Sequence, residues 1–239
     1  MNNEIAVEFS NFSPEGRLYQ IEYAIQAVKM GATVFGIKSD GGIILAVEKK
    51  KNSELIENKS IGKIIMLNNF IFCCFSGLTS DGRICIEKIR IFLENNSFLF
   101  NDLSCIEKCS RKIRQIISNV ASGESGELYI NRPLGVSFLV CGFDLSGCHL
   151  FSIDPSGNST EKKIASLGNG SKDAAFVIRE GFRDKMTSDE NKILALKSMR
   201  VVMENKITEK DVEMCILNSN TKKIIFPTQN QIKNFLEKL

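Results

Sequence analysis

The segment FSPEGRLYQIEYAIQAVKMG, residues 12–31, reads as one short amphipathic helix with marked ends. Ser13 can cap the helix N-terminus, Pro14 supplies a fixed φ near the start, and Gly31 stands where a left-handed stop is expected. Apolar side chains recur at helical spacing on one face, at Leu18, Ile21, Ile25 and Val28. Because polar residues occupy the other faces, the pattern predicts a helix over about residues 17–30 that packs on another element through one side.

The composition is that of an ordinary soluble globular protein, with 43% hydrophobic and 25% charged residues in a chain of 239. A net charge of +3 is too small to imply a nucleic-acid partner, and the basic run at residues 49–51 reads as a solvated turn. The N-terminus lacks the basic start and apolar run of a signal peptide. No apolar run approaches the ~18 residues that a membrane span needs, so we expect no membrane partner.

The cysteines and the histidine bear on metal binding and redox state. None of the 8 cysteines forms a CxxC pair, most lie in apolar runs, and His149 is the single histidine. We therefore expect reduced core cysteines, with no zinc site, no disulfide framework and no cofactor. The cysteines are Cys73, Cys74, Cys85, Cys105, Cys109, Cys141, Cys148 and Cys215.

Beyond the opening helix, hairpin-like strand pairs alternate with pairs of helices, and no Pro/Gly/Ser-rich linker interrupts the chain. Hairpins imply antiparallel sheets, and grouped helices cover sheets in layers, so the order predicts one α+β domain spanning residues 1–239. The predicted strands are 33–38, 43–48, 63–67, 70–76, 135–143, 148–153, 212–217 and 223–226; the predicted helices are 80–94, 104–121, 171–183, 188–204 and 229–239.

The literal residues of the opening segment resemble the signature of proteasome alpha-type subunits, in which a helix absent from the beta type precedes the first strand. Within that family, residues 25–29, 45–49 and 60–64 are most similar to the alpha type-5 paralogue. The resemblance implies a four-layer αββα sandwich of two antiparallel sheets, the N-terminal nucleophile hydrolase-like fold. It extends to Gly36-Ile37-Lys38, Ser76-Gly77-Leu78 followed by Asp81, Asn131 to Val136, Asp154 to Gly157, and Leu167 to Lys172.

The resemblance also bears on catalysis. Active members of the fold attack with a threonine at their own N-terminus, whose free α-amine takes the proton. The equivalent point here falls near Ala32-Thr33, behind some thirty residues, so the nitrogen is an amide and cannot act as a base. Glu48 and Lys63 lie roughly where active relatives place an acid and a lysine. We therefore expect a catalytically silent subunit with no catalytic residue.

Two other readings stay open, and a third, a serine-protease triad, is disfavoured. The chain could be an active threonine protease of the same fold, if its first ~30 residues were removed. It could be an unrelated α+β binding module with a small-molecule pocket. A Ser-His-Asp triad would have to use His149, and no GxSxG elbow is present.

As an alpha-type chain, the protein is expected to build an outer seven-membered ring with other alpha subunits, above beta subunits, in ubiquitin-dependent protein degradation. It would help to gate substrate entry and would receive the C-terminal tails of regulatory-particle ATPases or other activators, in the cytoplasm and nucleus. The resemblance assigns Lys63, Gly16, Glu22 and Gly77 to the pocket for those tails. It associates Pro14 and Tyr23 with the gate.

The first twelve residues depart from the family pattern. They are expected to be a mobile gate segment, but Ile5, Ala6 and Val7 stand where the family commonly has Tyr-Asp-Arg. These side chains offer neither a phenol nor a carboxylate. We therefore expect that this segment does not join the open-gate cluster in the usual way.

Overall fold

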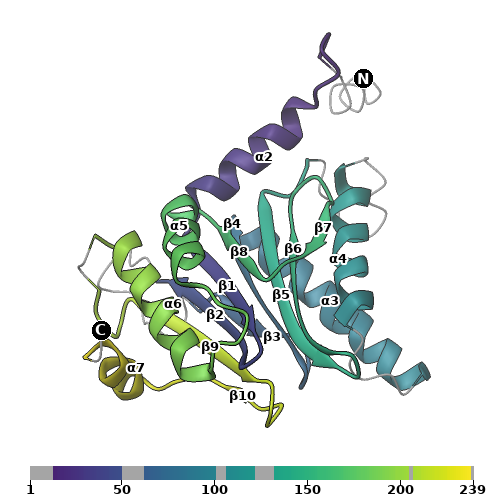
Figure 1. Cartoon of the computed structure of the whole chain (residues 1–239). Helices are drawn as coiled ribbons and strands as arrows, with labels where there is room; N and C mark the ends of the chain where they lie inside the picture. The colour runs from purple at the N-terminus through teal and green to yellow at the C-terminus, as the bar shows by residue number, and fades with distance from the viewer. Residues whose placement is uncertain (1–12, 50–61, 101–105, 122–131, 205–206, 238–239) are drawn as a thin grey trace.

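The computed structural model describes residues 13–49, 62–100, 106–121, 132–204 and 207–237. Two five-stranded antiparallel sheets face each other, in the strand orders β10-β9-β2-β1-β8 and β3-β4-β5-β6-β7. Helices α5, α6 and α7 cover the outer side of the first sheet, and α3 and α4 cover the second (Figure 1). This is the predicted four-layer αββα sandwich.

The first sheet contains β1 (Val34–Ser39), β2 (Gly42–Glu48), β8 (Ile164–Leu167), β9 (Val212–Asn218) and β10 (Ile224–Ile225). The second contains β3 (Ile64–Met66), β4 (Ile71–Gly77), β5 (Val136–Asp144), β6 (Gly147–Ile153) and β7 (Ser159–Glu161). The described helices are α2 (Tyr19–Met30), α3 (Thr79–Phe100), α4 (Ile106–Ala121), α5 (Ser171–Gly181), α6 (Ser188–Val202) and α7 (Gln229–Leu236).

The predicted strand pairs are confirmed. In the first hairpin Val34 pairs with Val47 and Ser39 with Gly42, so the turn is two residues shorter than the predicted strand ends at residues 38 and 43 implied. In the second, the Asn68 side-chain oxygen accepts the backbone N–H groups of Phe70 and Ile71 at 2.8 and 2.7 Å and so closes the turn. Strands β7 and β8 were not predicted, because they are only 3 and 4 residues long and β7 contains no apolar residue.

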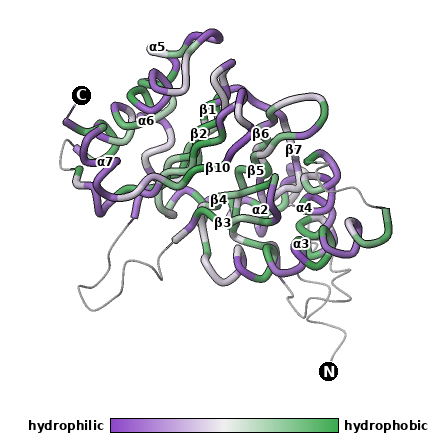
Figure 2. The backbone as a smooth tube through the Cα atoms, turned by 90° about the horizontal axis from the view of Figure 1, so that it is seen from below, coloured by the Kyte–Doolittle hydropathy of each residue, from purple (hydrophilic) through white to green (hydrophobic). Residues whose placement is uncertain are grey.

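Three buried clusters separate the layers. Alternation along β4 shows how one strand serves two of them: Phe72 and Cys74 point between the sheets, whereas Cys73 and Phe75 point toward α3 and α4. Hydrophobic residues accordingly concentrate on the paired strands, and hydrophilic ones on the outer loops and turns (Figure 2). Among the described residues, no helix is both long and apolar enough to cross a membrane.

The opening helix exists and ends at Met30 as predicted, but it starts two residues later and its predicted caps were wrong. Helix α2 begins at Tyr19 after Leu18, which makes no side-chain capping bond. Ser13 instead closes a separate turn, in which its hydroxyl accepts the Arg17 N–H at 3.0 Å and Pro14 is an exposed turn residue. Gly31 has an extended backbone with φ of −67°, so it is not a left-handed stop.

The apolar stripe of α2 is only partly covered. Ala24 and Val28 are its buried residues, whereas Leu18, Ile21 and Ile25 are half-buried. The helix meets the sandwich at its C-terminal end and points away from it toward the N-terminus (Figure 1). Much of α2 therefore packs against no other element in the described part of the chain.

Candidate functional site

Thr33, the residue at the nucleophile position of the resemblance, is held inside the structure. It is fully buried just before β1. Its backbone N–H donates to Oε2 of Glu48 at 3.0 Å, and its Oγ1 accepts the N–H of Gly170 at 3.1 Å. Gly170 is the residue before α5, so the hydroxyl serves one of the unpaired N–H groups of that helix. Neither the amide nitrogen nor the hydroxyl is placed to attack a peptide.

Lys63 lies immediately before β3. Its backbone N–H donates to Oε2 of Glu213 at 3.1 Å, and its ammonium stands 5.8 Å from the ring centroid of Phe75. The cation is thus oriented by an aromatic face at the end of β4, where Gly77 also lies.

Gly77 is required by its surroundings. It has φ of +112°, and a Cβ there would lie 2.1 Å from the carbonyl oxygen of Gly135. On its other side stands Gly31, where a Cβ would lie 2.4 Å from the Gly77 nitrogen. The glycine at the end of α2 is therefore needed for close approach of two chain segments, not for a helix stop.

Glu22 and Gly16 lie at the other end of α2. Glu22 accepts the Arg17 side-chain Nε–H at 2.6 Å, which ties the first turn of the helix to the turn at residues 13–17. Gly16 has φ of +77° and open space where a Cβ would stand. From Glu22 to Met30 the helix runs about 12 Å, at 1.5 Å per residue.

The four predicted pocket residues therefore fall into two groups. Lys63 and Gly77 belong to the end of the sandwich, and Gly16 and Glu22 to the far end of α2 (Figure 1). The gate-associated residues lie with the second group: Pro14 is exposed in the turn, and Tyr23 is 63% exposed and stacks on Tyr19 with centroids 6.5 Å apart. Residues 5–7 lie outside the described residues.

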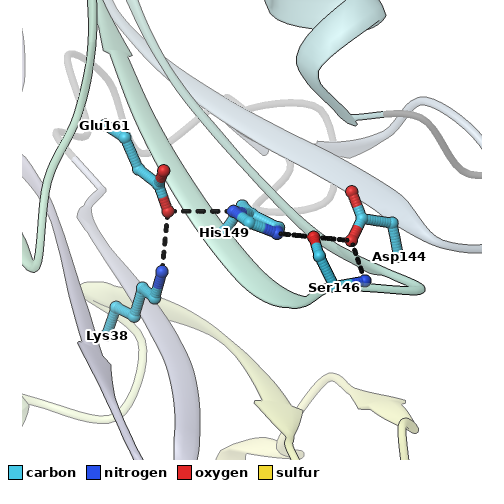
Figure 3. A network of polar contacts seen from close by, with 5 residues as sticks. All are labelled: Lys38, Asp144, Ser146, His149 and Glu161. Atoms are coloured by element: carbon cyan, nitrogen blue, oxygen red, sulfur yellow. Dashed lines mark hydrogen bonds and ion pairs between the residues drawn. The ribbon is translucent and has the colours of Figure 1, made fainter.

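A Ser-His-acid arrangement does occur, but it is not a catalytic triad (Figure 3). Ser146 Oγ lies 2.7 Å from His149 Nε2, and Nδ1 lies 2.9 Å from Glu161 Oε1, which also accepts the Lys38 ammonium at 2.7 Å. The Ser146 hydroxyl, however, donates to Asp144 Oδ1 at 2.5 Å. Its proton is directed to a carboxylate rather than to the imidazole, as a triad would need.

Electrostatics support a structural role for this network. Burial opposes ionisation of Glu161, but hydrogen bonds from Lys38 and His149 outweigh it and hold the pKa of Glu161 below its usual value. The network joins β1 of one sheet to β6 and β7 of the other. The network therefore links the two sheets at one edge.

The described cysteines form no disulfide with one another, and six of the seven are buried. Burial, with a smaller contribution from Asp81, raises the pKa of the Cys85 thiol to about 12. Such thiols are core residues without nucleophilic character. No group of three or more potential metal ligands occurs in the described part of the chain.

Comparison with known proteins gives two family matches. The family described as proteasome subunit matches residues 28–217, and the N-terminal signature of the A class of proteasome subunits matches residues 9–27. A relative from Schizosaccharomyces pombe, described as a probable alpha type-5 proteasome subunit, is 38% identical over 206 residues, 86% of this chain and 83% of the relative. The alpha type-5 proteasome subunits from Trypanosoma brucei brucei and Dictyostelium discoideum are 35% and 34% identical over 231 residues, 96% of this chain and 93% and 95% of theirs.

Proposed function

This chain belongs to the proteasome subunit family as a non-catalytic alpha-type member, and we propose that it shapes and gates the entry to the proteolytic chamber. The family match excludes the unrelated binding module. The alpha signature and the alpha type-5 relatives favour the non-catalytic reading over the active protease. Thr33 carries the physical argument, because its nitrogen is a hydrogen-bonded amide within a buried core.

The chain assembles with other proteasome subunits, and we propose a seven-membered ring of alpha subunits lying on beta subunits. Exposed apolar side chains support contacts of this kind where several lie on one element, since contiguous exposed apolar patches mark protein–protein interaction sites. Met30 and Tyr23 on α2 are 82% and 63% exposed, and Phe98 near the end of α3 is 90% exposed. Native mass spectrometry of the purified complex tests the arrangement; a monomer free of sister subunits would contradict it.

We propose further that activator tails dock between neighbouring alpha subunits. The division of the predicted pocket residues supports this, because Lys63 with Gly77, and Gly16 with Glu22, stand at separate places on one chain. Two neighbouring subunits could bring one group from each into a shared pocket. The Lys63 ammonium would pair with the terminal carboxylate of the tail.

The test exchanges the charge of Lys63. In the assembled particle, Lys63→Glu should weaken binding of a labelled activator C-terminal peptide at this pocket by about tenfold or more, the loss of a hydrogen bond to a charged group. Lys197→Glu, the same change on the exposed side of α6, is the matched control. Unchanged peptide affinity in Lys63→Glu, with normal ring assembly, would refute the pocket.

The remaining proposals concern the gate and the compartment. We propose that residues 1–12 contribute to the gate, where ordering each residue costs roughly 1–2 kcal/mol and must be offset by contacts. We also propose location in the cytoplasm and nucleus, with which the absence of disulfides among the described cysteines is compatible. A density map of the activated particle tests the gate proposal, and microscopy of a tagged chain tests the proposed location.

A further inference from the structure

Ser76 is a fully buried hydroxyl near the end of β4 that lies beneath the end of α2. Its Oγ donates to the carbonyl oxygen of Ala32 at 2.8 Å, and the carbonyl oxygen of Val28 lies within 3.3 Å. Val28 belongs to the last turn of α2, and Ala32 follows the helix. The carbonyls at a helix C-terminus have no partners within the helix, so a side chain there can fix the helix end.

Glycines from two other segments make room for this contact. A Cβ on Gly31 would lie 2.4 Å from Ser76 Oγ, and a Cβ on Gly168 would lie 2.9 Å from the same atom. Gly168 also has φ of +90°, which favours glycine. The segment after α2 and the segment before α5 therefore both pass so close to the Ser76 hydroxyl that neither leaves room for a Cβ.

The rest of α2 is held weakly. Ala24 and Val28 are its buried residues, and its N-cap residue makes no side-chain bond. Beside Ser76, a backbone bond from the Asn169 N–H to the Gly31 carbonyl oxygen at 3.1 Å fastens the same end. Because the helix is fastened at its C-terminal end, a small rotation there produces a larger displacement at Glu22, about 12 Å along the helix.

We propose that Ser76 is a positioning residue that sets the orientation of α2 on the sandwich. It thereby places Gly16 and Glu22 relative to the neighbouring subunit. This second step rests on the proposed docking of activator tails, whereas the first does not. Loss of the hydroxyl removes the donor to the Ala32 carbonyl oxygen, while the Val28 oxygen keeps the Gly31 N–H at 3.0 Å, and so it loosens the helix end.

The test is hydrogen exchange of α2 amides in the assembled particle. Ser76→Ala should speed exchange of the α2 amides about fivefold, the effect of losing one buried hydrogen bond, and leave the α4 amides unchanged. Ser198→Ala is the matched control, because Ser198 is equally buried and its Oγ donates to the Leu194 carbonyl oxygen at 2.8 Å within α6. The control should leave α2 unchanged.

Two outcomes separate this proposal from the docking proposal. Faster α2 exchange with unchanged binding of the labelled tail peptide would support the positioning role and refute its second step, the placement of Gly16 and Glu22 for tail docking, whereas the pocket itself is tested by Lys63→Glu. Unchanged α2 exchange in Ser76→Ala would overturn the positioning role. If Ser76→Ala does not assemble, Ser76→Cys keeps a weaker donor of similar size and should give a smaller acceleration; native-like α2 exchange in Ser76→Cys would overturn the proposal.

Discussion

Replacement of Asp81 by asparagine should loosen the junction between α3 and β5. The Asp81 side chain is 2% exposed in the first turn of α3. Its two oxygens accept the Arg132 guanidinium at 2.8 and 2.9 Å, and one also accepts the Gly135 N–H at 2.9 Å. Asparagine keeps the shape but removes the charge and places an amide donor among donors.

The expected loss follows from these contacts. A hydrogen bond to a charged group contributes about 1.5–3 kcal/mol, but Arg132 is 47% exposed and can be hydrated again when its partner is lost. We therefore expect the free energy of unfolding to fall by about 2 kcal/mol, measured by urea unfolding of the full chain at pH 7. Asp184→Asn breaks an exposed pair with Lys163 and should cost less than about 0.5 kcal/mol.

The stabilisation that ionised Asp81 contributes should depend on pH. Burial opposes ionisation of Asp81, but the bonds from Arg132 and Gly135 outweigh it and hold the pKa of this carboxyl below its usual value. Because the pKa is lower in the folded state, the stabilisation is complete above the unfolded value and is lost as pH falls through the folded one. The difference between native and Asp81→Asn should thus narrow below about pH 4. A difference under about 0.5 kcal/mol at pH 7, or one unchanged into acid, would refute the reasoning.

Three further predictions concern the nucleophile position, the glycine junction and the thiols. Thr33→Ala should leave peptide hydrolysis by the assembled particle unchanged and should lower the free energy of unfolding by about 1 kcal/mol, since the Gly170 N–H loses its acceptor. A fall in hydrolysis when the variant is incorporated would contradict this prediction. Gly31→Ala places a Cβ 2.4 Å from the Gly77 nitrogen and should destabilise the chain by about 1–3 kcal/mol in urea unfolding. The control Gly62→Ala, whose Cβ would lie 3.3 Å from its nearest atom, should cost much less. Equal effects of the two changes would count against the close contact between Gly31 and Gly77. Among the described cysteines, half-buried Cys148 should react first with a thiol reagent at pH 8, and Cys85 should react only after unfolding. Tandem mass spectrometry of the labelled peptides measures both rates. Labelling of Cys85 in the native protein at the same rate as Cys148 would refute this prediction.

Local patterns identified the elements well where they were long. The two hairpins with turns at residues 39–42 and 68–69 were predicted from β-rich runs that flank turn residues, and the structure has both. The described helices appear near their predicted positions, because apolar periodicity survives tertiary packing. Helix α3 continues to Phe100, beyond the predicted end at residue 94, since no glycine or proline stops it.

Helix ends and short strands were predicted less well. Ser13 and Gly31 have the residue types of helix caps, but one closes a separate turn and the other allows two backbones to touch. True capping boxes occur at Thr187 with Glu190 and at Thr228 with Gln231. Their spacing is visible in the sequence, so these two helix starts could have been located from the residues alone.

The sequence alone determined the class of protein, because the residues of 12–31 and the motifs after them recur in proteasome alpha subunits and need no coordinates to be read. Tertiary structure alone decided how distant residues meet. It buried Thr33 against Glu48 and Gly170, placed the Ser76 hydroxyl beneath α2, and separated Lys63 from Glu22. The physical reason is that periodicity records which face of an element is apolar, whereas a hydrogen bond between remote segments depends on where the sheets bring their ends together.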